Sequence, residues 1–335
     1  MKLGFKRVTA FILLSTFLVS GVSEQLLGID FKKAFAYSVP AGYASMAGAI
    51  GNIEDSKGPI QSFHTDLFTG RATASVPITL PPGRLGLSPS LGLSYSSSGG
   101  SSWVGTGWNL DTGFIQRSVK RGVPAYNDSQ DTFEFLINGV HSELVKVSTS
   151  YEYHAKDEGG DFLKFMYVSG YWTMQDKSGA TYTFGQNFQA QTTNVRGTYS
   201  WCLEKIQDVN GNTIHFTYTK DQGQTYLSRI DYNGNEFQGF PDTHSVEFTI
   251  ENRPDISFSF ITGAKVIFAK RLKKVTAKVQ GQIAREYTLA YEQSPYANKS
   301  RLISVRECGK DQATCLPAQT FTYYNVTPAF QNGVT

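Results

Sequence analysis

Cysteine, charge and long apolar runs are all scarce in this sequence of 335 residues. Its three cysteines are too few for the disulfide framework of a small secreted domain. Charged residues make up 18% of the chain, below the usual quarter, and a net charge of +3 gives no reason to expect a nucleic-acid partner. The apolar run at residues 8–19 is shorter than the roughly 20 residues of a membrane-spanning helix. These shortages argue against a nucleic-acid-binding protein and against a stable membrane span.

Motifs of catalysis and cofactor binding are also missing. No HExxH, CxxC or GxSxG sequence occurs, and no histidine has a partner at metal-ligand spacing. The glycine-rich segment 99–107 has neither a GxGxxG pattern nor the lysine of a phosphate-binding loop. We therefore predict no catalytic residue, no metal and no cofactor. The five histidines are His64, His141, His154, His215 and His244.

Aromatic residues and glycine are abundant. The 23 Phe and 18 Tyr favour pleated, half-buried surfaces, and 32 Gly supply turns. Alternating runs meet at Asn138-Gly139 and around 176–179, which is typical of β-hairpins. Residues 246–250 and 256–260 also alternate, and we interpret 251–255 as the connection between them. The expected fold is all-β, with antiparallel hairpins and meanders forming a large sandwich or a curved, partial shell-like sheet.

The chain is organised around residues 72–117. A strand that begins at Ala72 ends at the proline-glycine turn 81–83, because proline cannot donate to a strand ladder. Residues 87–95 alternate with period two, as a half-buried strand does. A serine- and glycine-rich loop follows, and then the sequences GTGW and FIQR.

The order of these features resembles the N-terminal domain of the Salmonella virulence plasmid B protein family, which the B component of insecticidal toxin complexes shares. The resemblance implies a β-rich, non-catalytic domain that begins a hollow shell around a toxic polypeptide. It also implies that the partners are other protein modules of a toxin or Rhs-type assembly. The residues that carry it, expected to be structural, are Pro81, Pro82, Gly83, Arg84, Tyr95, Gly105, Gly107, Trp108 and Arg117.

A weak internal repeat lies at about residues 201–240. The pattern L-x-x-I-x-D-x-x-G-N-x5-Y runs from Leu203 to Tyr218 and begins again at Leu227, with Asp231 one place early. This spacing resembles the tyrosine-aspartate (Rhs/YD) repeats that build β-shells. Each unit would be a strand, a turn capped by aspartate and a returning strand.

The domain prediction begins with a signal peptide at residues 1–36, because a basic start precedes the apolar run and Ala34-Phe35-Ala36 fits the cleavage rule. An uncleaved anchor is the alternative. A flexible arm (37–62), the β domain (63–325) and a C-terminal tail (326–335) leading to missing downstream modules complete the chain. The expected location is secreted, through a Sec-type signal, with cell-surface association as an alternative.

Two of the three cysteines are close in sequence. Cys308 and Cys315 are expected to close a loop by a disulfide if the chain is exported, and three free thiols are the alternative. Cys202 follows Trp201 in a strand-like run and is expected to be a buried, unreactive thiol.

A basic face is expected along residues 265–278. We interpret it as a solvated edge strand whose lysines resist strand addition. The alternative is a site for an acidic partner or a lipid headgroup. Its members are Lys265, Lys270, Arg271, Lys273, Lys274 and Lys278.

Three functions are weighed. The first is a non-catalytic, exported structural and interaction domain, related to the shell-forming part of toxin-complex B components and a truncated member of that group. The second is a secreted carbohydrate-binding or surface-adhesion module, with a glycan stacked on Trp103, Trp108, Trp172 and Trp201. The third is a hydrolase with a carboxylate pair drawn from Asp111, Asp128, Asp131, Glu134 and Glu143.

Overall fold

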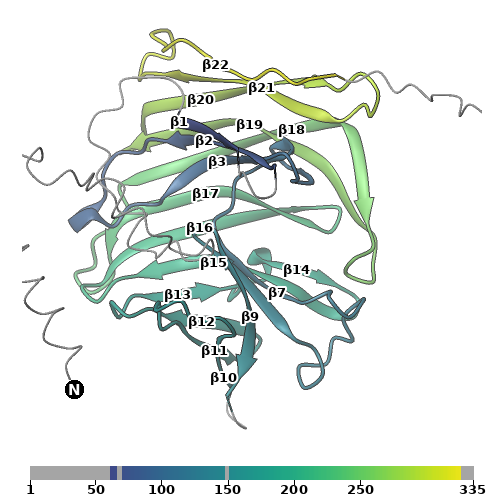
Figure 1. The fold of residues 1–335 in the computed structure, drawn as a ribbon. Helices are drawn as coiled ribbons and strands as arrows, with labels where there is room; N and C mark the ends of the chain where they lie inside the picture. The colour runs from purple at the N-terminus through teal and green to yellow at the C-terminus, as the bar shows by residue number, and fades with distance from the viewer. Residues whose placement is uncertain (1–60, 66–69, 148–150, 326–335) are drawn as a thin grey trace, which may run out of the picture. The chain divides into compact units, whose positions relative to one another are not determined.

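The computed structural model describes residues 61–65, 70–147 and 151–325, all within the second of two compact units, residues 46–335. The predicted signal peptide, the arm up to residue 60 and the C-terminal tail lie outside the described residues. The all-β prediction is confirmed (Figure 1). The helical elements of the described ranges are two three-residue 3-10 turns, and none of them is long enough to cross a membrane.

Most strands are short in the first half of the domain and long in the second. The 3-10 turns are η3 (Arg84–Gly86) and η4 (Phe188–Ala190). The strands are β1 (Gln61–Thr65), β2 (Ala72–Ile78), β3 (Leu91–Ser96), β4 (Ser101–Ser102), β5 (Gly105–Thr106), β6 (Trp108–Asn109), β7 (Phe114–Arg117), β8 (Phe133–Ile137), β9 (Val140–Lys146), β10 (Glu152–Ala155), β11 (Lys164–Val168), β12 (Tyr171–Gln175), β13 (Thr181–Phe184), β14 (Gln191–Asn194), β15 (Gly197–Gln207), β16 (Asn212–Asp221), β17 (Gln224–Asn235), β18 (His244–Ser259), β19 (Val266–Val279), β20 (Gln282–Gln293), β21 (Ser300–Cys308) and β22 (Gln319–Thr320).

Eight strands close into a barrel, which the sequence did not predict. β7 to β13 pair antiparallel in chain order, and β15 completes the ring by pairing with both β7 and β13. Aromatic side chains from opposite walls meet inside it: the ring centroid of Trp172 lies 5.0 Å from that of Phe133 and 6.1 Å from that of Trp201. Closure removes the free edges that a flat sheet would leave.

A meander continues from the barrel strand β15. β16 to β22 follow antiparallel in chain order, and Figure 1 shows them stacked from β15 towards β22. The small sheet β1-β2-β3-β6 packs on this meander through tyrosines. The Tyr232 hydroxyl donates to the Pro81 carbonyl at 2.8 Å, and the Tyr287 hydroxyl accepts from the Thr79 N–H at 3.0 Å. The predicted sandwich is thus a small sheet on a large one.

The predicted connection at 251–255 is wrong. β18 runs through this segment without a turn, and its pairing with β19 shifts register at two places, between Thr249 and Ile250 and, at a larger bulge, between Asn252 and Ser257. Before the bulge Val246 and Phe248 are buried, whereas after it Phe258, with the same parity, is exposed. The bulge therefore exchanges the two faces of the strand.

The predicted repeat at 201–240 forms only its first turn. Asp208 accepts hydrogen bonds from the N–H groups of Asn210 and Asn212, as an aspartate-capped turn requires. Asp231 lies in the middle of β17 instead, opposite His215, and pairs with Arg229. The second copy is therefore not a structural repeat of the first.

The predicted basic edge at 265–278 is also wrong, because β19 lies inside the meander between β18 and β20. Its cations are mostly paired with carboxylates on those neighbours. Arg271 and Lys273 contact Glu251, Lys274 contacts Glu286 at 3.0 Å, and Lys278 contacts Glu247 at 2.7 Å. Ion pairs with the neighbouring strands therefore neutralise most of the positive charge of β19.

Candidate functional site

The turn after β2 holds the first signature residues. Pro81 accepts the Tyr232 hydroxyl, and the Gly83 N–H donates to Ser88 Oγ at 2.6 Å. A Cβ on Gly83 would collide with the Leu87 carbonyl, so only glycine fits. The Arg84 guanidinium lies over the Phe240 ring at 5.0 Å. Pro82 completes the turn, whose contacts join the small sheet to the meander.

Trp108 joins the small sheet to the C-terminal segment. It is 2% exposed and packs on Tyr95, with 5.3 Å between ring centroids. Its indole N–H donates to the Tyr323 hydroxyl at 2.8 Å, and this hydroxyl donates to the Leu302 carbonyl at 2.7 Å. Gly107 makes the packing feasible, because a Cβ there would lie 2.5 Å from the Tyr95 ring.

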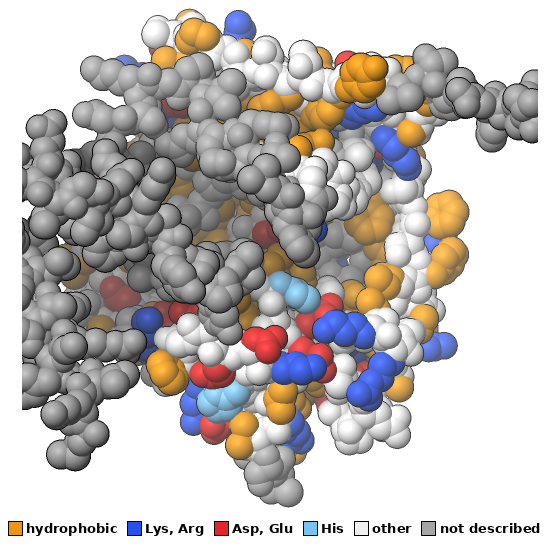
Figure 2. All heavy atoms as spheres, in the orientation of Figure 1, with side chains coloured by type: hydrophobic (Ala, Val, Ile, Leu, Met, Phe, Trp, Pro, Cys, Tyr) orange, Lys and Arg blue, Asp and Glu red, His pale blue; other side chains and the backbone are white. Residues whose placement is uncertain are grey.

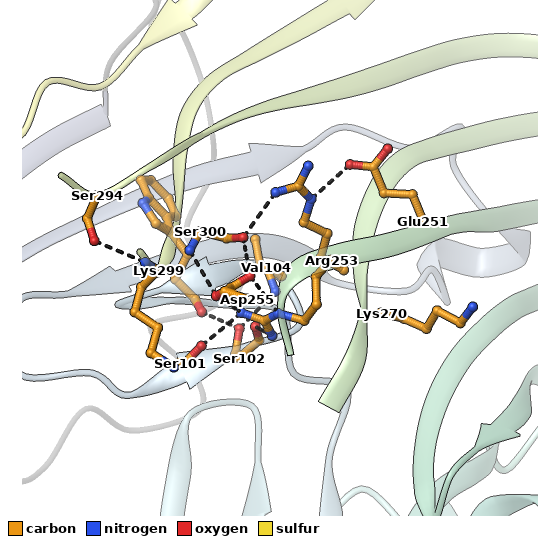
Figure 3. Close-up of polar contacts among 12 residues, drawn as sticks. Ser101, Ser102, Val104, Glu251, Arg253, Asp255, Lys270, Ser294, Lys299 and Ser300 are labelled. Atoms are coloured by element: carbon orange, nitrogen blue, oxygen red, sulfur yellow. Dashed lines mark hydrogen bonds and ion pairs between the residues drawn. The ribbon is translucent and has the colours of Figure 1, made fainter. Parts of the chain in front are cut away.

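Gly105 sits where the β4–β5 hairpin meets a buried ion pair, shown in Figure 3. A Cβ on this glycine would lie 3.1 Å from the Ser300 carbonyl oxygen. The Arg253 guanidinium donates to Asp255 and reaches the hairpin at the Ser102 carbonyl (2.9 Å) and Ser101 Oγ (3.0 Å). The cluster therefore fastens the hairpin to β18 and β21.

Asp255 is ionised in this buried setting. Burial by itself raises the pKa of its carboxyl, but hydrogen bonds from Arg253 and from the Ser300 hydroxyl and N–H outweigh that effect and hold the pKa well below its usual range. The side chains of Arg253 and Asp255 are 1% and 2% exposed. A buried pair of this kind is stabilising only while both partners are present.

Arg117 closes one end of the barrel. It donates to Asp131 at 2.7 Å, to Asp128 at 2.6 Å and to the Thr198 carbonyl at 2.8 Å. Its guanidinium also lies over the ring of Trp201 at 5.5 Å. Asp131 in turn accepts N–H groups of the loop that precedes it. Arg117 thus ties this loop to the barrel.

The nine signature residues do not converge on one pocket. Each lies where two layers or segments of the domain meet, which fits a structural role. Their partners, which the sequence did not reveal, are Arg253, Asp255, Ser300 and Tyr323. The signal available was the Arg-Pro-Asp sequence at 253–255, which lies within the segment 251–255 that we interpreted as a connection between strands.

The tryptophans do not form a sugar-stacking surface. Trp108, Trp172 and Trp201 are no more than 2% exposed, so their faces are not available to a ligand. Trp103 is half-buried, packs near Phe248 at 6.1 Å and donates to the Leu110 carbonyl. The prediction that all four act as stacking platforms is wrong.

A cavity of about 420 Å³ opens beside β15, where this strand stops pairing with β16 and pairs with β7 instead. Aromatic and aliphatic side chains and many hydroxyls line it, and Asp111 is the sole charged residue among them. Lining residues include Trp103, Asp111, Tyr199, Cys202, Tyr218 and Tyr226. Most of these hydroxyls already bind the protein; the Tyr218 hydroxyl, for example, donates to the Leu203 carbonyl at 2.5 Å.

The titrating groups of the cavity are poorly placed for catalysis. Burial raises the pKa of the Asp111 carboxyl, against a hydrogen bond from Asn109 that lowers it. Burial also raises the pKa of the Cys202 thiol to about 12, which keeps it protonated and unreactive at neutral pH. Asp111 has no second carboxylate among the lining residues, as a glycosidase pair would require.

The other candidate carboxylates serve contacts within the protein. Asp128 and Asp131 pair with Arg117, Glu134 accepts from Gln116 at 2.6 Å, and Glu143 pairs with two lysines. His141, His154 and His215 each lie beside a carboxylate, but no group of three potential metal ligands occurs within the described ranges.

Cys308 and Cys315 face each other across the loop that follows β21. Their sulfurs lie 2.01 Å apart, at the distance of a disulfide bond, and the backbones of the two residues form an isolated bridge. The N–H of Gly309 and the Asp311 carboxylate, which accepts from Thr314, organise the loop between them.

The fold and part of the sequence are similar to proteins of the virulence plasmid B type. Residues 67–169 match the family model described as Salmonella virulence plasmid 65kDa B protein. The resemblance predicted from residues 72–117 is thereby confirmed, whereas the Rhs/YD repeats are not shown.

Particular relatives are similar to parts of this chain. Mono(ADP-ribosyl)transferase SpvB of Salmonella choleraesuis is 27% identical over 195 residues, or 50% of this chain, and the match spans 32% of that relative's length. The solved N-terminal domain of effector protein SpvB from Salmonella typhimurium aligns with a TM-score of 0.59 and 20% identity, covering 70% of this chain and 98% of that one. TcdB2-TccC3 aligns with a TM-score of 0.63 and 19% identity, covering 76% of this chain and 16% of that one.

Proposed function

We propose that this chain is an exported, non-catalytic structural domain that works as one module of a toxin-enclosing or toxin-delivering assembly. The observation that carries the proposal is the fold match to TcdB2-TccC3 over 76% of this chain but 16% of that one. In such an arrangement the domain would contribute sheet surface and contacts to a larger structure. The proposed partners are other protein modules of the same assembly.

The polar clusters of the domain support this proposal. The best-defined charged groups, Arg117 with Asp128 and Asp131 and Arg253 with Asp255, bind one another and the backbone. Groups that are saturated in this way hold layers together and are not poised to bind a substrate. The transferase activity for which the Salmonella relatives are named belongs to proteins of which this match spans 32%.

The enzymatic part of the proposal is tested with labelled NAD. We expect the purified full chain to transfer no label to proteins of a cell extract above the level of a heat-denatured sample. Transfer that is lost on heating would contradict the non-catalytic assignment.

The structural part is tested by crosslinking the tagged chain in the medium of cells that produce it. We expect a discrete complex with another protein, at constant stoichiometry. Trp108→Ala, which loosens the junction of the small sheet, should weaken this complex, while the exposed substitution Leu316→Ser should not. Recovery of the chain as an uncomplexed monomer in every sample would contradict the proposal.

Export is tested through the thiols. If the chain is exported, Cys308 and Cys315 should resist alkylation until a reductant is added. Ready alkylation of both in the folded, secreted chain would show that the disulfide is not formed and would argue against an oxidising location.

A further inference from the structure

The end of the β18–β19 hairpin has its polar and apolar faces reversed. Ile256, Phe258 and Phe260 point to solvent and are 62%, 62% and 57% exposed, while Ser257 and Ser259 between them are half-buried. A sheet with one solvated face normally shows the opposite pattern. We call the exposed group the hairpin-end patch; it consists of Val123, Ile256, Phe258, Phe260 and Ile261.

The reversal is fixed by the fold. From Asn252 to Ser257 the chain advances five residues along β18, while the partner strand advances only two, from Lys270 to Phe268. The difference is odd, so every following side chain changes face. The buried Arg253–Asp255 pair holds the bulge in place. A return to the ordinary register would separate Arg253 from Asp255 and from the Ser102 carbonyl.

The patch is also held in position. The Thr262 carbonyl at the hairpin end accepts from the Tyr126 hydroxyl at 2.6 Å and from Asn194 at 2.9 Å. Gly263 lies against Val123 and Arg196, since a Cβ there would be 2.8 Å from the valine. The aromatic side chains are thus presented by a supported backbone, so little entropy is lost when they bind.

Basic side chains surround the patch. Lys265 Nζ lies over the Phe258 ring at 5.0 Å, Arg196 is exposed beside Gly263, and Arg121 is exposed two positions before Val123 in the sequence. No ion pair is recorded for these three within the described ranges, unlike the paired cations further along β19. The acidic neighbour Asp128 is held by Arg117 at 2.6 Å.

We propose that the hairpin-end patch docks on the surface of an anionic lipid bilayer. Phe258 and Phe260 enter the interface, where aromatic side chains bind well, and the three cations lie at the level of the anionic headgroups. Figure 2 shows apolar side chains together with basic ones along the right margin, over the end of β18 and β19.

Charge favours a membrane over a second copy of the chain. A symmetric dimer through this patch would bring Lys265, Arg196 and Arg121 close to their own counterparts, and like charges repel. An anionic bilayer complements the same ring of cations. This proposal does not depend on the proposed function, because a toxin-assembly module and an unrelated exported domain could both bind lipid.

Sedimentation with vesicles tests the proposal. The full chain is mixed with vesicles of phosphatidylcholine and with vesicles in which about one lipid in three is phosphatidylserine. We expect binding to the anionic vesicles that weakens as salt is raised. Phe258→Ser with Phe260→Ser should reduce the partition coefficient at least about tenfold, given the apolar area removed. Lys265→Glu with Arg196→Glu should abolish the preference for anionic lipid.

The controls separate this patch from the rest of the chain. Every variant carries the same N-terminal apolar run, so only differences between variants count. Leu316→Ser removes an equally exposed side chain, 60% accessible, from the loop between β21 and β22 and should bind as the unchanged chain does. Phe258→Trp should bind and shift its fluorescence to the blue on anionic vesicles.

Two results would overturn the proposal. One is equal sedimentation of the unchanged chain and the double serine variant at matched thermal stability. The other is a concentration-dependent dimer that the serine substitutions dissolve, since the patch would then be a contact between copies.

Discussion

Gly107 shows at the residue scale why the GTGW sequence carries so much information. Its φ is +78°, and a Cβ there would lie 2.5 Å from the Tyr95 ring. Gly281 has nearly the same φ, +79°, but open space around it. The two glycines therefore share the backbone requirement and differ only in packing.

This pair gives the first prediction. Gly281→Ala should lower the free energy of unfolding by about 1 kcal/mol, the cost of a strained backbone. Gly107→Ala should lower it by about 1–3 kcal/mol more, because the Tyr95–Trp108 packing must also shift. Urea unfolding followed by tryptophan fluorescence measures both. Equal losses for the two variants would mean that the close packing at Gly107 has no energetic weight.

At the scale of the element, the register of β18 depends on one buried ion pair. Removing one partner leaves the other charge buried and unpaired. We expect Asp255→Asn or Arg253→Met to lower the free energy of unfolding by about 3–5 kcal/mol. The double variant Arg253→Met/Asp255→Leu should lose less than the sum of the single changes. Additive losses in urea unfolding would show that the two side chains act independently.

Acid should act on the same pair. The pKa of Asp255 is lower in the folded protein than in the unfolded chain, where it is about 3.9. The stabilisation is therefore fully present above about pH 4 and is lost as the pH falls further. Asp255→Asn should flatten the pH dependence of the unfolding free energy below that value, relative to Asp157→Asn, a change of an exposed aspartate in a loop. An unchanged slope in the first variant would contradict this linkage.

Elements with local signals could be predicted from the sequence, and those with distant partners could not. The hairpin at Asn138-Gly139 could be predicted because asparagine and glycine tolerate the positive φ that a two-residue turn requires. In the structure their φ values are +50° and +79°. The bulge in β18 is held by hydrogen bonds from Arg253 to Ser101 and Ser102, about 150 residues away, so the sequence near Arg253 does not predict it. The barrel likewise depends on the pairing of β13 with β15 and of β15 with β7.

The candidate site shows the same division. The signature sequence identified the segment and the family that it resembles, because several uncommon features occur in one order. It did not reveal what those residues contact, because their partners are distant in sequence. Trp108 donates to Tyr323, and Gly105 lies against the Ser300 carbonyl, only in the folded chain.

At the scale of the whole domain, the barrel and the meander share β15 and one continuous apolar core. A shared central strand couples the two parts, so neither can unfold without exposing the other. We expect a single cooperative thermal transition, with circular dichroism and tryptophan fluorescence giving the same midpoint. Trp172 and Trp201 lie in the barrel and Trp103 and Trp108 outside it, so fluorescence reports on both parts through a few sites, and the far-ultraviolet signal reports on all strands. Separate midpoints would show that the domain holds more than one folding unit.

The contact between Trp108 and Tyr323 spans 215 positions of the chain. During synthesis the indole emerges long before the residues that cover it, Phe321 and Tyr323. The domain therefore cannot complete its packing until almost all of it has left the ribosome. Until residues 321–323 have been synthesised, one face of the Trp108 indole therefore stays uncovered on the growing polypeptide.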